Sequence, residues 1–160
     1  MRMKFFIDWH KAITFVVVLA LIWIYDEWEN PTAWVYLGLH GSYGLLWALK
    51  SRFFPDRTWE KRVSPLQGLG IWLALSTYWA APWLLIIRGV QAPGWLLGLC
   101  TGLYAFGVFF HFAGDMQKST HLALRPGELI TGGLFSLSRN INYFGELLIY
   151  TAFALLAMHF

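Results

Sequence analysis

Residues 114–146 read GDMQKSTHLALRPGELITGGLFSLSRNINYFGE, and they form the only long polar interruption in the second half of an otherwise apolar chain. Because apolar segments flank this stretch, we expect the chain to leave a membrane at its start and to re-enter at its end. Asn142 and Glu146 lie inside the beginning of the last apolar run, where a carboxylate is costly unless it has a partner or a function. The stretch therefore predicts a membrane fold and marks its functional region.

The composition agrees with a membrane protein. The 160 residues are 58% hydrophobic and 13% charged, with a mean hydropathy of +0.50, whereas soluble domains carry about 25% charged residues. This length allows one domain, residues 1–160. A single cysteine, Cys100, excludes a disulfide framework and C-x-x-C metal chemistry. We attribute the formal charge of +3 to membrane topology and expect no nucleic-acid partner.

The pattern of apolar runs predicts an all-α integral membrane bundle with about five transmembrane helices. Each run has about the twenty residues that a bilayer core requires. Pro82 is expected to kink the third span, because proline lacks one backbone donor and clashes with the preceding turn. The expected spans are residues 5–25, 33–49, 66–87, 94–113 and 143–160.

The basic residues predict the orientation. With the N-terminus in the cytoplasm, eleven of the twelve Lys and Arg residues face the cytoplasm and only Arg88 lies outside, as the positive-inside rule requires. For a bacterial chain this means the inner membrane. Residues 114–146 then face the cytoplasm, where nucleotide cofactors are found.

The fourth span carries Gly94, Gly98 and Gly102 at four-residue steps. This spacing lets another helix approach closely. We expect close helix packing along this ridge, and we keep open that it is the contact face of a homo-oligomer.

Asn142, Glu146 and Tyr150 share one face of the last helix, because residues four apart lie above one another. One interpretation is a strip of interhelical hydrogen bonds, with Glu146 paired to Arg139 or His111. The other is the polar wall of a cofactor pocket. In either case we expect Glu146 to face the bundle interior, within hydrogen-bonding reach of Asn142, His111 or a cofactor amide.

Three cations of the polar stretch, Lys118, Arg125 and Arg139, allow two interpretations. They follow from topology and lipid headgroup contacts, or they form a phosphate clamp, for which the planar guanidinium of arginine is suited. The chain has no G-x-G-x-x-G or Walker motif, so a bound nucleotide must lie between helices. His111 and Asp115 share a helix face, as a simple hydrogen-bonded pair or as part of the same site. The histidine spacing predicts no metal site.

The motifs of this region resemble those of a known family. Gly132-Gly133-Leu134-Phe135 and Asn142-Tyr143-Phe144-Gly145-Glu146, preceded by a D-x-x-K element and an RPGE turn, are similar to the C-terminal half of the steroid 5α-reductases and of the related steroid-dehydrogenase-like (DUF1295) bacterial membrane proteins. The resemblance covers residues 115–154. It implies that Asn142 and Glu146 hold the nicotinamide part of NADPH and that Asp115, with His111 as a substitution, lies at the adenosine side. The resulting cofactor-binding candidates are His111, Asp115, Lys118, Arg125, Arg139, Asn142, Tyr143 and Glu146.

The sequence also departs from this family. The relatives polarise the substrate ketone with a Glu and a Tyr from early helices, but the first four spans contain no glutamate. Tyr43 and Tyr78 are the phenol donors that remain as catalytic candidates. The relatives also continue beyond NYFGE with another helix and a basic, aromatic tail, so we expect a truncated or degenerate member.

The leading functional hypothesis is a membrane reductase that passes a hydride from NADPH to the β-carbon of a lipid or steroid-like enone. Its lipophilic substrate would occupy an apolar cavity between helices. One alternative is a membrane methyltransferase of the isoprenylcysteine or phospholipid type, which uses S-adenosylmethionine and carries a related RHPxYxG motif. The NYFGE and GGLF motifs favour the reductase. The other alternative is a non-catalytic membrane fragment that pairs with a partner.

Overall fold

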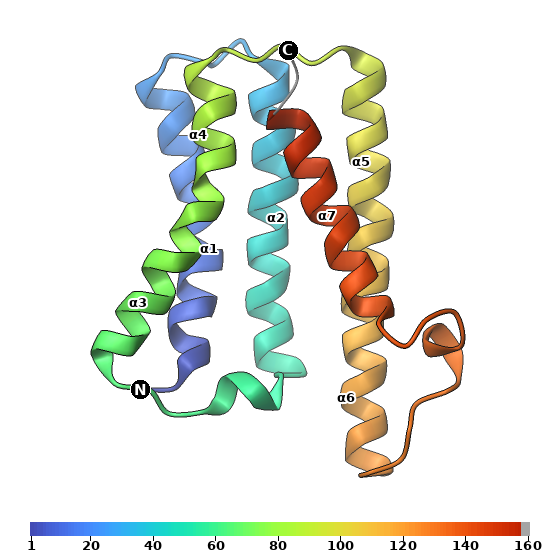
Figure 1. Cartoon of the computed structure of the whole chain (residues 1–160). Coiled ribbons are helices and arrows are strands. Elements are labelled where there is room, and N and C mark those ends of the chain that lie inside the picture. The colour runs from blue at the N-terminus through green and yellow to red at the C-terminus, as the bar shows by residue number, and fades with distance from the viewer. Residues whose placement is uncertain (158–160) are drawn as a thin grey trace.

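A computed structural model describes residues 1–157, and all regular structure in that range is helical. The helices of residues 1–157 form rods that stand side by side (Figure 1). The first two rods are α1 (Met3–Ile24) and α2 (Pro31–Phe53). The third joins α3 (Pro65–Ser76) to α4 (Ala80–Ile87), the fourth joins α5 (Gly94–Val108) to α6 (Gly114–Leu124), and the fifth is α7 (Ile141–Ala157). The predicted all-α bundle is confirmed.

Three of the rods, Met3–Ile24, Pro65–Ile87 and Gly94–Leu124, are long and apolar enough to cross a membrane. The shorter apolar helix α7 and the 23-residue α2 complete the bundle. The predicted fifth span extended to residue 160, and its last three residues lie outside the described range. Beyond the predicted end of the fourth span at residue 113, the rod continues as a polar helix, α6, to Leu124.

Pro82 distorts the third rod as expected. A helical residue at position 82 would donate its backbone N–H to the carbonyl of Tyr78, and proline cannot. The rod narrows to a 3-10 turn at Thr77–Trp79, between α3 and α4. The distortion places Tyr78 against α7, where its ring stacks on that of Tyr150 with centroids 5.1 Å apart.

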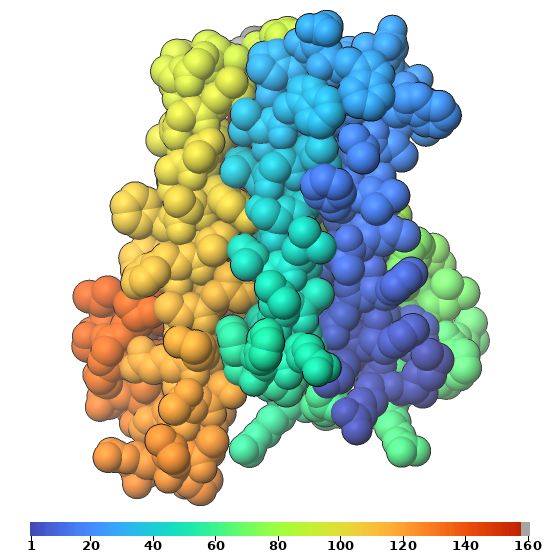
Figure 2. Space-filling view, turned by 180° about the vertical axis from the view of Figure 1, so that it is seen from behind, coloured from blue at the N-terminus to red at the C-terminus, as the bar shows by residue number. Residues whose placement is uncertain are grey.

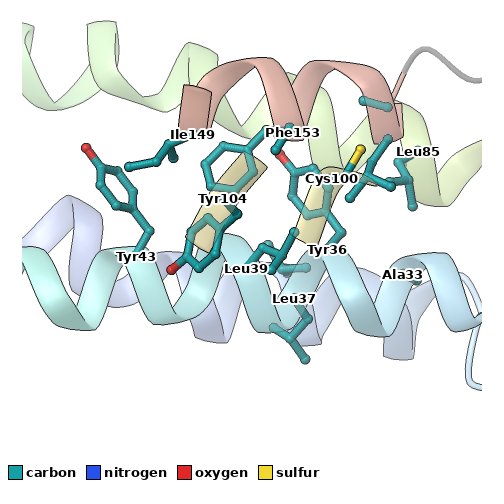
Figure 3. Packing of buried hydrophobic residues seen from close by; sticks show 14 of the residues in the cluster. Ala33, Tyr36, Leu37, Leu39, Tyr43, Leu85, Cys100, Tyr104, Ile149 and Phe153 are labelled. Atoms are coloured by element: carbon teal, nitrogen blue, oxygen red, sulfur yellow. The ribbon is translucent and has the colours of Figure 1, made fainter. Parts of the chain in front are cut away.

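The core lies between α1, α2, α4, α5 and α7. Its most buried members include Val18, Ile22, Tyr36, Leu85, Cys100, Ile149 and Leu156. Figure 3 shows how the side chains of α2 and α7 meet there, with Tyr36 close to Phe153. This apolar packing fixes the relative positions of the helices that carry the polar residues.

The basic segments gather at one end of the bundle. The N-terminus, the α2–α3 connection, α6 and the loop after it share that end, whereas the α1–α2 and α4–α5 turns, with Arg88, lie at the other (Figure 1). The chain start is tied to the α2–α3 connection by backbone hydrogen bonds from Met3 to Lys61 (2.8 Å) and from Val63 to Met1 (2.9 Å). This arrangement agrees with the predicted clustering of basic residues. That the basic end is cytoplasmic remains a prediction.

Candidate functional site

The start of α7 is pressed against the fourth rod at a pair of glycines. A methyl group added to Gly107 would lie 2.8 Å from the Gly145 carbonyl oxygen, so neither position has room for a side chain. Just beyond this crossing the rod widens into a π-helical turn, Phe109–Ala113, which contains His111. Such turns are frequent at functional sites. The close approach brings Asn142 of the NYFGE motif beside His111 and Asp115.

The side chain of Asp115 contacts most of the other polar residues at this crossing. Its carboxylate accepts a hydrogen bond from the Asn142 amide (2.8 Å) and forms an ion pair with Lys50 from the last turn of α2. The His111 Nε2 atom lies 3.9 Å from the same carboxylate, while Nδ1 lies 3.2 Å from the Asn142 carbonyl oxygen. The structure therefore brings together three predicted site residues, His111, Asp115 and Asn142.

A pocket of about 390 Å³ opens beside Asp115 at the basic end. We call it the basic pocket, and Figure 2 shows a notch at this end between α6 and the segment that follows α2. Its cations are Lys50, Arg57 and Lys118, and its other lining residues are Phe54, Pro55, Asp56, Thr58, Asp115, Ser119, Leu122 and Ala123. Lys118, one of the three cations of the predicted phosphate clamp, lies on α6.

The charge of the pocket acts on its own carboxylate, Asp56. Burial raises the pKa of Asp56, but the hydrogen bond from the Thr58 backbone N–H (2.8 Å) and the charges of Lys118 and Lys50 outweigh this and hold the pKa below its ordinary value. A carboxylate is thus favoured in its charged form here, as expected where it accepts a backbone hydrogen bond and lies near cations.

The remaining predicted clamp residues lie elsewhere. Arg125 is exposed and pairs only with Glu128, at 3.8 Å. Arg139 and Tyr143 are also exposed, and none of these three side chains lines the basic pocket. The loop of Arg139 is held to α6 by Gln117, which donates to the Gly132 carbonyl (2.6 Å) and accepts from the Leu134 N–H (3.1 Å). The GGLF motif makes this turn: Gly133 has a φ of +59°, and an added Cβ would lie 2.6 Å from the Gln117 amide nitrogen.

Glu146 is half-buried on α7 and makes no hydrogen bond or ion pair within residues 1–157. The expected bonds to Asn142, His111 or Arg139 are therefore not formed. The Glu146 charge instead acts on Lys11 of α1. The carboxylate therefore lies near a second polar cluster, which contains Lys11.

That second cluster surrounds Lys11. The Lys11 ammonium donates hydrogen bonds of 3.3 Å to the hydroxyls of Tyr43 and Tyr150, and it lies 4.2 Å above the Trp47 ring. Tyr43, a catalytic candidate, is 1% exposed, and Tyr78, the other candidate, is stacked on Tyr150. The structure thus links both candidates to one lysine.

Two cavities adjoin this cluster. The polar chamber holds about 10 Å³ and is lined by His10, Lys11, Thr14, His40, Tyr43, Gly44, Leu75, Tyr78 and Tyr150. The apolar groove holds about 500 Å³ between α2, α4 and α7 and is lined by Tyr36, His40, Thr77, Tyr78, Ala80, Ala81, Leu84, Arg88, Tyr150, Phe153, Ala154 and Ala157. His40, Tyr78 and Tyr150 line both spaces.

Sequence reasoning missed Lys11 and Lys50 as site residues, because it counted them only as topological charges. The available signal was their position inside or at the end of an apolar run, where a charge needs a partner. The prediction that helices pack closely along Gly94, Gly98 and Gly102 was also wrong, because these glycines face open space in the described chain. A homo-oligomer through this face remains a prediction.

Comparison with known proteins gives one family match for this chain. A family model described as "Protein of unknown function (DUF1295)" matches residues 51–160, which include α3 to α7 and therefore Asp115, Asn142 and Glu146. Searches of the curated proteins and of the solved structures found no match.

Proposed function

The chain belongs to the DUF1295 family, and we propose that it is a membrane-embedded reductase that uses NADPH to saturate the carbon–carbon double bond of a lipid or steroid-like enone. The reaction adds one hydride and one proton from water across the double bond and breaks no other bond of the substrate. The proposal joins the basic pocket to the resemblance of the NYFGE region to steroid 5α-reductases.

The observation that carries the proposal is the basic pocket beside Asp115. Its cations fit the phosphates of a dinucleotide, because Arg57 and Lys118 line one space of about 390 Å³ beside the ion pair of Lys50 and Asp115. The planar guanidinium of one arginine can bind two phosphate oxygens at once, whereas the lysine ammonium acts as a point charge. The pocket suits the phosphate-bearing part of NADPH, and it lies at the end of the bundle that we expect to be cytoplasmic.

The adjacent polar groups fit the amide end of the same molecule. Asn142 uses its Nδ2 atom to donate to Asp115, and within residues 1–157 its Oδ1 atom accepts no hydrogen bond. His111 Nε2 is buried and likewise without a hydrogen-bond partner in that range. Asp115 holds Asn142 in place and prevents rotation of its amide. When bound, NADPH supplies the hydride that the β-carbon of an enone receives.

The apolar groove provides space for the substrate. Its volume of about 500 Å³ falls within the range typical of small-molecule pockets. Apolar side chains such as Leu84 and Phe153 line most of it, as a flat lipid requires.

Calorimetric titration of the purified chain in detergent, with NADPH and with S-adenosylmethionine, tests the proposal. We expect heat from NADPH, and we expect Lys118→Ala to weaken NADPH binding by about tenfold through loss of a charged hydrogen bond. Arg125→Ala, which removes an exposed cation outside the pocket, is the matched control and should leave the affinity unchanged. If only S-adenosylmethionine gives binding heat, the reductase proposal is wrong and the methyltransferase alternative is favoured. Equal losses in the two variants would show that the basic pocket is not the phosphate site.

A further inference from the structure

One end of the apolar groove carries a guanidinium. Arg88 lines the groove at the residue where α4 ends. Within residues 1–157 the lining includes no other Lys or Arg and no Asp or Glu. In small-molecule pockets, the few polar groups among apolar walls fix the orientation of the ligand. The position of Arg88 therefore bears on the charge of the molecule that the groove accepts.

The Arg88 side chain has no protein partner in the described range. It makes no ion pair and no hydrogen bond within residues 1–157. Asp26, Glu27 and Glu29 lie at the same end of the bundle, in the α1–α2 turn (Figure 1), but none of them lines the groove. The Glu27 carboxylate instead accepts a hydrogen bond from the Asn30 amide, at 2.9 Å. The donors of the guanidinium thus remain available for an anionic group.

The other cations of the chain are far from Arg88. All eleven of the remaining Lys and Arg residues belong to the half of the bundle that ends at the basic pocket. A ligand that binds Arg88 through an anionic group is therefore held in one direction along the groove. Its other end points toward Tyr78, which also lines the groove and precedes Arg88 by ten residues, or about 15 Å of helix.

The surroundings of Arg88 favour a group with a single negative charge. The planar guanidinium matches the two oxygens of a carboxylate. A phosphate monoester carries about 1.5–2 negative charges at neutral pH. The acidic α1–α2 turn is close, since a Cβ added to Gly89 would lie 3.1 Å from a Glu27 carboxylate oxygen, and it opposes a second negative charge. A carboxylate therefore fits this end of the groove better than a phosphate monoester.

We infer that the apolar groove binds a lipophilic carboxylic acid, with its apolar body beside Leu84, Phe153 and Ala154 and its carboxylate on Arg88. Arg88 is thus the residue that determines the charge of the ligand. That this acid is the substrate rests on the proposed function. An enone acid held in this way extends from Arg88 toward the end of the bundle where NADPH is proposed to bind. The DUF1295 match assigns no ligand to the groove.

The test is binding without nucleotide, with two probes that differ in charge. Tritiated 3-oxoandrost-4-ene-17β-carboxylic acid is an anion at about pH 9, and the tritiated 17β-carboxamide has nearly the same shape without the charge. Equilibrium dialysis against the chain in phosphatidylcholine nanodiscs, corrected with empty nanodiscs, gives the ratio of their affinities. This ratio does not depend on the folded fraction of a variant. We expect a preference for the acid of about tenfold, the value of one charged hydrogen bond.

Arg88→Gln should remove this preference. Arg125→Gln is the matched control, because it removes an exposed cation that pairs only with Glu128 and lies outside the groove, and it should retain the preference. Equal affinities for the two probes in the unmodified chain, or an unchanged preference in Arg88→Gln, would overturn the inference.

A second pair of variants tests the place of the apolar body. Ala154 is an exposed residue of the groove, so Ala154→Phe fills ligand space without entering the core, and it should weaken binding of both probes by about tenfold. Ala105→Phe adds the same ring at an exposed position of α5 outside the groove and should leave both affinities unchanged. Unchanged binding of both probes in Ala154→Phe would overturn the inference.

The acid site and the reductase proposal can fail separately. If NADPH gives no binding heat but Arg88→Gln abolishes the preference for the acid, the acid site stands and the reductase proposal falls. If NADPH-dependent reduction of the enone proceeds while the acid and the amide bind equally, the reductase stands and the acid site falls.

Discussion

The Lys50 ammonium and the Asp115 carboxylate form an ion pair that is almost fully withdrawn from solvent, with side-chain exposures of 5% and 10%. The pair joins the last turn of α2 to the first turn of α6. Asp115 also binds the Asn142 amide of α7 at 2.8 Å. One carboxylate thus links three helices at the inner edge of the basic pocket.

The first prediction concerns this pair. Asp115→Asn leaves the Lys50 charge buried without its partner, and such losses typically cost about 3–5 kcal/mol. We expect a decrease of that order in the free energy of unfolding, measured by denaturant titration in detergent. Glu128→Gln makes a similar acid-to-amide change in the exposed pair with Arg125, where less than about 1 kcal/mol is expected. Similar losses in both variants would show that Lys50 and Asp115 do not form a buried pair.

The second prediction concerns the crossing of α5 and α7. Gly107→Ala places a methyl group 2.8 Å from the Gly145 carbonyl oxygen and forces the helices apart, which should cost about 1–3 kcal/mol. Gly98→Ala is the matched control on the same helix, where the added methyl meets nothing. It should stabilise the monomer by up to about 1 kcal/mol, the difference in helix propensity. A destabilising Gly98→Ala with a neutral Gly107→Ala would reverse this assignment.

The glycines also show how far the sequence could predict the packing. Four-residue spacing marks a ridge within one helix, so Gly94, Gly98 and Gly102 were visible. Gly107 and Gly145 meet across two helices, and no spacing within one segment reveals such a pair. The helical spans, in contrast, were predicted well, because apolar length and flanking charge are local properties of the chain.

The candidate site also contains residues that the sequence predicted and residues that it did not. His111, Asp115 and Asn142 were predicted by a shared helix face and a motif, and the structure brings them together. Lys11 and Lys50 were missed, because a lysine near a membrane surface and a lysine turned into the bundle look alike in sequence. Only the rotation of α1 about its axis directs Lys11 toward Tyr43 and Tyr150.

The third prediction concerns Glu146. Its carboxylate is half-buried and forms no hydrogen bond in the described chain, and we propose that the amide of NADPH is its partner. Glu146→Gln should therefore weaken NADPH binding by about 1–3 kcal/mol and change stability far less. Calorimetry and thermal unfolding of the same preparation separate the two effects. Intact binding and a raised melting temperature in Glu146→Leu would contradict a role in holding the cofactor.

The fourth prediction concerns orientation. On a Cys100→Ala background, cysteines at positions 57 and 125 should resist a membrane-impermeant thiol reagent added from outside. A cysteine at position 88 should react, since Arg88 lies at the opposite end of the bundle. Both expectations follow from the excess of basic residues at one end. Strong labelling from outside at position 57 or 125 would invert the topology and place the basic pocket on the wrong side for a cytoplasmic nucleotide.

The most direct test of the reductase proposal follows the hydride itself. The 160-residue chain, reconstituted in lipid nanodiscs, is incubated with androst-4-en-3-one and NADPH deuterated at the transferred position, and the steroid is analysed by mass spectrometry. We predict a saturated ketone with one deuterium on the β-carbon, and markedly less of it with Lys118→Ala than with Arg125→Ala. Recovery of the unchanged enone, or a saturated ketone without deuterium, would contradict the proposal.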